Sequence, residues 1–358
     1  MKALVVGGTG FVGMNVVRAL VAAGHEVSAT RRPHGNTLFA RRLGAQLVHV
    51  DLDDKDSLTD AMRGRDVVFM CAGHYPRYSL DIDAEVRVAR ARVRNTLDAA
   101  RRAGVERYVL TSSVATVGPP ARGRRYSGEQ DRAEPRSLRS VYHAVKAAIE
   151  DEAARACRAG LDVVVLLPTA IFGELDVKAG TGYLIVALGN GAMPFYVEGR
   201  TNVIDADDLA RAHILAAERG RPGERYIVGG HNLMTSELIE HIADALGVAQ
   251  SVQRLPARLA GLVATLSEMR AQALDDGRRP LIARELVDVV RFGRWVSTEK
   301  AERELGLPKP TPLDSTLDKA CHWYARHRYV RPRQGDRHDR VHTTDPDRCR
   351  NHHPAYPS

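Results

Sequence analysis

Tyr142 and Lys146 are the residues of this chain whose types and spacing most directly indicate chemistry. They stand four positions apart in a segment with a helical pattern, so both side chains lie on the same side of the expected helix. A free tyrosine hydroxyl has a pKa of about 10, and a neighbouring ammonium favours its phenolate. Tyr142 is therefore a candidate proton donor or acceptor. A tyrosine–lysine pair at this spacing is common by chance. Whether this pair is catalytic therefore depends on the segments that surround it.

The first thirteen residues contain a glycine-punctuated turn between an apolar run, Ala3–Val6, and a helical pattern, Met14–Ala23. Glycines in such a turn let the backbone bend tightly and approach a pyrophosphate, and Gly13 allows the helix to pack closely. The N-terminus of the helix presents free N–H groups and a partial positive charge to the anion. This order of strand, turn and helix predicts a dinucleotide-binding site. Its residues are Gly7, Thr9, Gly10, Phe11, Val12 and Gly13.

Strand and helix patterns alternate through the first half of the chain. Short apolar runs predict buried strands at Ala3–Val6, Glu26–Thr30, Gln46–Val50, Asp66–Cys71, Arg107–Thr111 and Asp162–Leu167. Helical patterns lie between them at Gly13–Ala23, Ser57–Met62, Ala84–Ala103 and Val141–Ala159. A glycine stands just past each helix, where a C-terminal cap is expected: Gly24, Gly64, Gly104 and Gly160. The alternation predicts an α/β fold, a doubly wound parallel sheet with helices on both faces.

In an open parallel sheet, ligands bind at the carboxyl ends of the strands. Besides the glycine turn, that edge carries Cys71-Ala72-Gly73, Thr111-Ser112-Ser113 and Pro168. We therefore expect these segments to converge on one crevice, with Cys71, Ala72, Gly73 and Thr111 on the cofactor side.

The end of the second strand bears on which dinucleotide binds. NAD-binding folds of this type usually place a carboxylate there, bonded to the ribose 2′-hydroxyl. This chain has Arg31 and Arg32 instead, and guanidinium groups bind a 2′-phosphate well. We therefore expect NADP(H) rather than NAD(H). At the end of the third strand, Asp51-Leu52 either contacts the adenine or, through Asp51, caps the following helix.

Composition excludes several classes of protein. The 358 residues carry a net charge of +8, spread without a lysine-rich block, which favours a solvated arginine-rich surface over a nucleic-acid partner. The four cysteines, Cys71, Cys157, Cys321 and Cys349, form no Cys-x-x-Cys motif, so we expect neither a disulfide framework nor a zinc site but a reducing cytoplasm. No apolar run reaches the roughly 18 residues of a membrane span.

Past Pro168 the strand–helix regularity fades. A βα-like stretch returns over 203–230, followed by helical patterns at Thr235–Leu246, Pro256–Leu274, Ala283–Val289, Glu299–Leu305 and Leu313–Arg326. We predict a dinucleotide-binding domain of residues 1–173 and 203–230, and a smaller, mostly helical substrate lobe of residues 174–202 and 231–328. Residues 331–358 are polar and predict a disordered tail, in which the histidines and Cys349 have no scaffold to hold a metal.

Together these segments resemble the extended short-chain dehydrogenases/reductases of the NAD-dependent epimerase/dehydratase type, which have a Rossmann-type sheet. The motifs are Gly7-x-x-Gly10-x-x-Gly13, Asp51-Leu52, Thr111-Ser112-Ser113, Tyr142-x-x-x-Lys146, Pro168–Gly173 and Asn202–Asp208. The resemblance implies a Ser-Tyr-Lys set in which Ser113 polarises the substrate oxygen and Tyr142 passes the proton. Lys146 would lower the pKa of the tyrosine and hold the nicotinamide ribose. The segment containing Pro168, Ala170 and Ile171 would line the nicotinamide side, and a homodimer is expected.

Within that family the likeness is to the dihydroflavonol-4-reductase-like branch, which includes 3β-hydroxysteroid dehydrogenase relatives. Sugar-nucleotide epimerases usually carry an arginine-containing motif where this chain has Thr201-Asn202-Val203. We therefore expect an NADP(H)-dependent oxidoreductase acting on a carbonyl or secondary alcohol of a small, largely apolar metabolite. The alternatives are an NDP-sugar epimerase or dehydratase with tightly bound NAD(P), and a non-catalytic NAD(P)-sensing protein. Expected substrate contacts are His74, Tyr75, Ser113, Tyr183 and Phe195.

Overall fold

The computed structural model describes residues 1–31, 37–74, 79, 81–133, 140–249, 252–274 and 284–331. Two residues of the expected site, Arg32 and Tyr75, lie outside the described residues, as does the expected tail from residue 332 onward.

The first half of the chain builds a seven-stranded parallel sheet with the strand order β3-β2-β1-β4-β5-β6-β10. Its strands are β1 (Lys2–Val6), β2 (Glu26–Arg31), β3 (Gln46–His49), β4 (Val67–Met70), β5 (Arg107–Thr111), β6 (Val163–Pro168) and β10 (Arg225–Val228). The order reverses direction between β1 and β4, so the sheet is doubly wound. The predicted Rossmann-type fold is confirmed.

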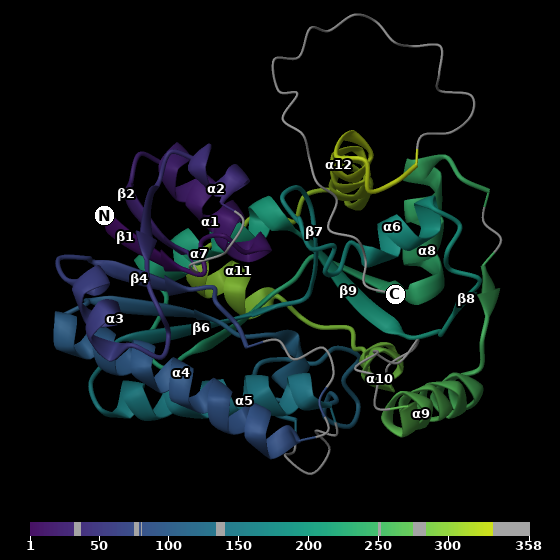
Figure 1. The fold of residues 1–358 in the computed structure, drawn as a ribbon, viewed down its shortest axis with the longest axis horizontal. Helices are drawn as coiled ribbons and strands as arrows, with labels where there is room; N and C mark the ends of the chain where they lie inside the picture. The colour runs from purple at the N-terminus through teal and green to yellow at the C-terminus, as the bar shows by residue number, and fades with distance from the viewer. Residues whose placement is uncertain are drawn as a thin grey trace, which may run out of the picture.

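Helices cover both faces of this sheet (Figure 1). One face packs against α3 (Lys55–Met62), α4 (Ile82–Ala103) and α5 (Val141–Arg158), and the other against α1 (Phe11–Ala22), α7 (Ala206–Arg219) and α11 (Glu299–Leu305). Alternate residues of each strand point to opposite faces. Leu4 and Val6 therefore lie in the first core, whereas Ala3 and Val5 lie in the second, and all four are fully buried.

Glycines end the helices as the sequence predicts. Gly24, Gly64, Gly104 and Gly160 have φ angles of 77°, 67°, 71° and 95°. A side chain is strained in this left-handed region, so glycine allows each chain reversal without a steric penalty.

The second half of the chain adds a three-stranded sheet and a group of helices beside the first sheet (Figure 1). The small sheet has the order β11-β9-β7, formed by β7 (Ala170–Phe172), β9 (Arg200–Asp205) and β11 (His231–Met234). A third core lies between these strands and the nearby helices. The remaining elements are α6 (Tyr183–Gly189), β8 (Phe195–Tyr196), α8 (Thr235–Leu246), β12 (Gln253–Arg254), α9 (Ala257–Leu274), α10 (Arg284–Arg291) and α12 (Leu313–Arg326).

Three local features differ from the sequence prediction. Helix α1 begins at Phe11 rather than at Gly13 or Met14, because Gly10 already has the extended backbone of an N-cap. A short helix, α2 (Leu38–Arg41), was not predicted because four residues carry no periodicity. Strand β9 begins at Arg200 and belongs to the small sheet, not to the large one. None of the described helices combines the length and the hydrophobicity that a membrane-spanning helix requires.

Candidate active site

The glycine turn lies between the end of β1 and the start of α1. The N–H of Gly10 donates to the carbonyl oxygen of Gly7 at 2.9 Å, and no side chain caps α1. A Cβ at position 13 would lie 2.2 Å from the Gly7 carbonyl oxygen, so only glycine allows this approach of helix and turn. The first N–H groups of α1 remain available to an anion. This side-chain-free cradle fits the pyrophosphate of a dinucleotide.

The end of β4 packs against the same turn. The N–H of Ala72 donates to the carbonyl oxygen of Val6 at 2.8 Å. Gly7 has a φ of 83°, and a Cβ there would lie 2.6 Å from the Ala72 nitrogen. A Cβ at Gly73 would in turn lie 3.6 Å from Nζ of Lys146. The predicted convergence of the glycine turn, the β4 end and the lysine on one crevice therefore has a geometric basis.

Tyr142 and Lys146 lie in the first turns of α5. Nζ of Lys146 is 5.8 Å from the centroid of the Tyr142 ring and donates to the carbonyl oxygen of Thr111 at 3.2 Å. The Lys146 side chain is buried, with 6% of its surface exposed. Burial lowers the pKa of Lys146 to about 8, and the nearby Glu150 and Cys71 partly oppose this shift. Lys146 therefore lies next to Tyr142 and releases its proton at a lower pH than an exposed lysine does.

Ser113 follows β5 and caps the short helix η1 (Val114–Thr116), where its hydroxyl accepts from the N–H of Ala115 at 3.2 Å. Two residues earlier, the Thr111 hydroxyl lies 2.8 Å from Nε2 of His213. Burial lowers the pKa of His213 to about 4, so this histidine is neutral. Its Nδ1 lies 2.8 Å from the carbonyl oxygen of Leu209, which leaves Nε2 as the acceptor from Thr111. The contact between Thr111 and His213 therefore holds the end of β5, which Ser113 follows.

The adenosine side of the crevice is described in part. Arg31 is the last residue of β2 and is half-buried. The alternative role of Asp51 as a helix cap is wrong, because Asp54 caps α3 by accepting from two backbone N–H groups. Asp51 instead accepts from the N–H of Asp53 at 3.0 Å. The carbonyl oxygen of Leu52 accepts from the side-chain amide of Asn95 at 3.0 Å, a helix-packing contact.

Pro168 ends β6, and Ala170 and Ile171 continue into β7, which pairs with β9. After β7, the carboxylate of Asp176 accepts from the N–H groups of Gly180 and Gly182 at 3.0 and 3.2 Å, and from the Tyr324 hydroxyl at 2.8 Å. These bonds hold the loop that leads into α6.

The expected substrate contacts lie on three segments. His74 follows β4, and its Nε2 contacts the carboxylate of Glu85 in the first turn of α4. Tyr183 on α6 and Phe195 on β8 are each 52% exposed, whereas the neighbouring Tyr196 packs against the third core. The structure does not join these residues into one wall, and their role in binding substrate stays a prediction.

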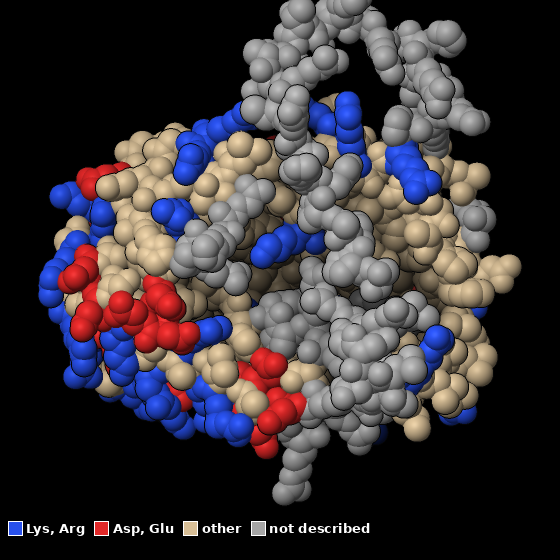
Figure 2. Space-filling view, viewed as in Figure 1, with Lys and Arg blue, Asp and Glu red and all other residues tan. Residues whose placement is uncertain are grey.

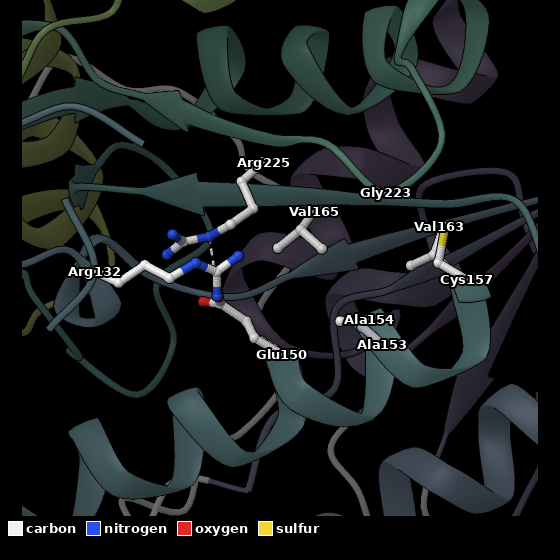
Figure 3. A pocket seen from close by; sticks show the side chains of 9 residues that line it. All are labelled: Arg132, Glu150, Ala153, Ala154, Cys157, Val163, Val165, Gly223 and Arg225. Carbon is white, nitrogen blue, oxygen red and sulfur yellow. Dashed lines mark ion pairs between the residues drawn. The ribbon is translucent and has the colours of Figure 1, made fainter. Parts of the chain in front are cut away.

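Sequence reasoning missed a buried ion pair behind the Tyr142–Lys146 pair. Glu150 on α5 lies 2.9 Å from Nε of Arg225 on β10 (Figure 3). A signal was present: Glu150 stands four residues after Lys146 and eight after Tyr142, so a charged residue repeats on a helix face that must be buried.

Charged side chains of both signs lie around the crevice. Figure 2 shows a hollow between the two halves of the molecule, with Lys and Arg side chains at its border. The basic side chains at this border can attract an anionic cofactor. In the part of the chain that the structure describes, no group of three His, Cys, Asp or Glu side chains is placed to hold a metal ion.

A parallel sheet with a glycine cradle at one strand end, and a helix carrying a half-buried tyrosine and a buried lysine at the same edge, is typical of a dinucleotide-dependent enzyme. Comparison with known proteins identifies the family. Residues 3–229 match the NAD dependent epimerase/dehydratase family, and this chain belongs to it.

Its relatives include reductases and sterol-related proteins. A putative dihydroflavonol 4-reductase from Synechocystis sp. is 34% identical over 332 residues, which is 91% of this chain and 95% of the relative. Sterol demethylase protein B from Methylococcus capsulatus is 29% identical over 325 residues, 90% of this chain and 98% of the relative. A solved nucleoside-diphosphate-sugar epimerase from Pseudomonas aeruginosa is 31% identical, has a TM-score of 0.79, and covers 92% of this chain and 99% of its own.

These relationships confirm the expected branch, the dihydroflavonol-4-reductase-like and 3β-hydroxysteroid-dehydrogenase-like group of extended short-chain dehydrogenases/reductases. The protein is an NAD(P)-dependent oxidoreductase acting on carbonyl or alcohol groups.

Proposed function

We propose that this protein is an NADP(H)-dependent oxidoreductase that interconverts a carbonyl and a secondary alcohol in a small, largely apolar metabolite. The observation that carries the proposal is the buried Lys146, held by the Thr111 carbonyl beside Tyr142 and next to the β4 end that packs on the glycine turn. A purely structural lysine gains nothing from full burial without a carboxylate partner at contact distance.

The residues at the strand ends fit a nicotinamide dinucleotide. The glycine turn would hold the pyrophosphate, Asp51 and Leu52 the adenine side, and Arg31 with Arg32 the 2′-phosphate of NADP(H). The rest of the site would be lined by residues at the ends of β4, β5 and β6 and in β7: Cys71, Ala72, Gly73, Thr111, Pro168, Ala170 and Ile171. When bound, the nicotinamide supplies or accepts the hydride.

The protein's own residues would handle the proton and the substrate oxygen. Ser113 would donate a hydrogen bond to the carbonyl oxygen, and Tyr142 would deliver the proton that turns the developing alkoxide into an alcohol. Lys146 favours the tyrosinate that remains, since its ammonium lies near the phenol ring. The Tyr142 phenol can therefore serve as an acid near neutral pH and be reprotonated from solvent.

The substrate is proposed to contact His74, Tyr75, Tyr183 and Phe195. Two of these are exposed aromatic rings, which suit an apolar ligand. The relative named a dihydroflavonol 4-reductase and the sterol-related relative support a carbonyl compound with a ring system as substrate.

A second candidate function is epimerisation or dehydration of an NDP-sugar, supported by the similarity to the nucleoside-diphosphate-sugar epimerase. The Thr201-Asn202-Val203 segment argues against it. Asn202 is buried, and its amide donates to Asn232 at 3.0 Å while its oxygen accepts from the Gly230 N–H at 2.9 Å. It therefore supports the small sheet and offers no cation to a diphosphate.

The test is an assay of NADPH and NADH consumption with a dihydroflavonol, a 3-ketosteroid and a UDP-sugar. We expect NADPH-dependent reduction of a ring ketone, and Tyr142→Phe to lower kcat by about 10²- to 10⁴-fold. Tyr126→Phe, which alters a tyrosine exposed beside Trp295, is the matched control and should retain activity.

Arg31→Glu should weaken NADPH binding on the order of tenfold without weakening NADH binding. Redox-neutral conversion of the UDP-sugar without net NADPH consumption would refute the proposal, and unaltered activity in Tyr142→Phe would remove Tyr142 from the mechanism.

A further inference from the structure

A buried carboxylate joins the two segments that carry the proposed Ser-Tyr-Lys set. Glu150 is 5% exposed and lies on α5, one helical turn after Lys146. Its Oε1 accepts from the Ser112 hydroxyl and, at 2.7 Å, from the Thr116 hydroxyl. Both hydroxyls belong to the segment after β5, so Glu150 ties that segment to the helix of Tyr142.

Arg225 holds this carboxylate from the neighbouring strand. Its Nε lies 2.9 Å from Oε2 of Glu150, and a second guanidinium nitrogen donates to the Thr116 hydroxyl oxygen at 2.8 Å. Its third nitrogen donates to the carbonyl oxygen of Glu129 at 2.8 Å. Figure 3 shows Arg225 and Arg132 reaching toward Glu150 from β10 and from the chain after η1. Of these, Arg225 is buried and Arg132 is exposed, so Arg225 is the fixed partner.

The two hydroxyls flank the serine proposed to polarise the substrate. Ser112 precedes Ser113, and the Thr116 hydroxyl also lies 3.0 Å from the carbonyl oxygen of Ser113. Ser113 is thus bracketed by two groups that end on one carboxylate. Because a displacement of about 1 Å at a reacting group can lower a rate about 10²-fold, such bracketing is worth more to catalysis than to stability.

We propose that Glu150, clamped by Arg225, is a positioning residue of the active site, which fixes Ser113 relative to Tyr142 and Lys146 and maintains a negative charge near the Lys146 ammonium. This inference rests on the proposed function for the role of Ser113. Glu150 itself touches no reacting atom, because one of its oxygens receives two hydroxyls and the other faces a guanidinium.

The groups that face Lys146 determine which substitution tests the effect of Glu150 on its pKa. Lys146 is faced by Glu150 from its own helix, by Cys71 from the β4 end, and by the Thr111 carbonyl from β5. Among these, Glu150 is the residue whose charge can be removed without changing side-chain volume. Glu150→Gln removes the charge of the ion pair, and its single amide oxygen cannot accept both from the Arg225 guanidinium and from the Ser112 and Thr116 hydroxyls, which weakens the clamp.

A matched control lies two residues further along the same helix. Glu152 is 4% exposed and is also ion-paired, at 3.0 Å from Arg94 and 3.1 Å from Arg155. Glu152→Gln removes a buried, paired carboxylate from α5 without altering any contact to the Ser113 segment. It therefore carries the stability loss expected of either variant but not the proposed positioning effect.

The first measurement needs no substrate. The chain has seven lysines, so ¹³C-labelled lysine NMR resolves them, and Lys146→Arg assigns the resonance of interest. We expect Lys146 to titrate at lower pH in Glu150→Gln than in the wild type, because an opposing charge has been removed, and to titrate unchanged in Glu152→Gln. Identical titration in all three proteins would overturn the electrostatic part of the proposal.

The second measurement is steady-state kinetics on the ketone that the wild type reduces. Glu150→Gln should lower kcat on the order of 10- to 100-fold with the NADPH affinity unchanged, and Glu152→Gln should leave kcat unchanged. Thr116→Val keeps Glu150 and its ion pair but loses the hydroxyl that contacts the Ser113 carbonyl; it serves as the folded alternative if Glu150→Gln is insoluble. Its kcat should fall about fivefold. Equal kcat in Glu150→Gln, Thr116→Val and the wild type would refute the positioning role. A wild type that reduces no ketone would refute the proposed function instead, while the lysine titration would still decide the effect of Glu150.

Discussion

Replacing Lys146 with methionine is expected to make the cofactor-free protein more stable at pH 7. Burial lowers the pKa of Lys146 from 10.5 to about 8, which means that the folded state holds its ammonium less readily than the unfolded chain does. At about 1.4 kcal/mol for each pKa unit, the penalty is about 3 kcal/mol. Methionine has a similar length and no charge, so it removes this penalty.

One loss opposes the gain. The Thr111 carbonyl oxygen, which accepts from Nζ at 3.2 Å, would lose this partner, at a cost of about 1 kcal/mol. The net result at pH 7 is a gain of about 2 kcal/mol in the free energy of unfolding. The penalty in the wild type is fully present below pH 8 and disappears as the pH rises from about 8 to 10.5, because the lysine is then neutral in both states. Near pH 10.5 the variant should therefore be the less stable protein by about 1 kcal/mol.

Urea unfolding of both proteins at pH 7 and pH 10.5 measures this crossover. Lys178→Met, which alters an exposed lysine, is the control and should change the free energy of unfolding by less than about 0.5 kcal/mol at either pH. A Lys146→Met protein that is less stable than the wild type at pH 7, by an amount that does not vary with pH, would refute the reasoning. Stabilisation together with lost catalysis would identify Lys146 as a residue retained for activity at the expense of stability.

Three further outcomes follow from contacts described above. Gly7→Ala, at a φ of 83° and with a Cβ 2.6 Å from backbone, should lower NADPH affinity measured by fluorescence quenching, whereas Gly24→Ala, at a φ of 77° but facing open space, should cost about 1 kcal/mol of stability and leave affinity unchanged. Asp176→Ala should lower the urea-unfolding free energy by about 2–3 kcal/mol because two N–H groups and a hydroxyl lose their acceptor, while Tyr324→Phe should lower it by only about 1 kcal/mol; equal losses would contradict the assignment. Tyr142→Phe should bind NADPH with wild-type affinity in the same fluorescence assay, and a large loss of binding would mean that the hydroxyl holds the cofactor rather than the proton.

The glycine turn and the Tyr142–Lys146 pair could be predicted because each is formed by residues that are close together in the sequence. The apolar run, the glycine turn and the helix after it are adjacent in sequence, so their order alone indicates the cradle around Gly7. The spacing of Tyr142 and Lys146 likewise follows from the helical repeat. Both could be recognised without knowing how the sheet is assembled.

Contacts between distant segments could not be found in this way. The pairing of Glu150 with Arg225 depends on β10 taking the place beside β6, which no periodicity specifies. The sequence left Asp51 open between an adenine contact and a cap of α3, and it did not single out Asp54, which is the residue that caps the helix. Only the backbone angles at the helix start decide between them.

The three-stranded sheet would allow the second half of the chain, which contains the proposed substrate lobe, to be exchanged as a unit. β7 follows β6 after one residue, β11 follows β10 after two, and β9 leads directly into α7. Each of these three strands is therefore separated by at most two residues from the large sheet or from α7, which covers it. β9 is hydrogen-bonded to both β7 and β11. Chimeras joined within these three strands would take the intervening segments from a relative with another substrate, yet keep the glycine turn, the tyrosine–lysine helix and the Glu150–Arg225 pair of this chain.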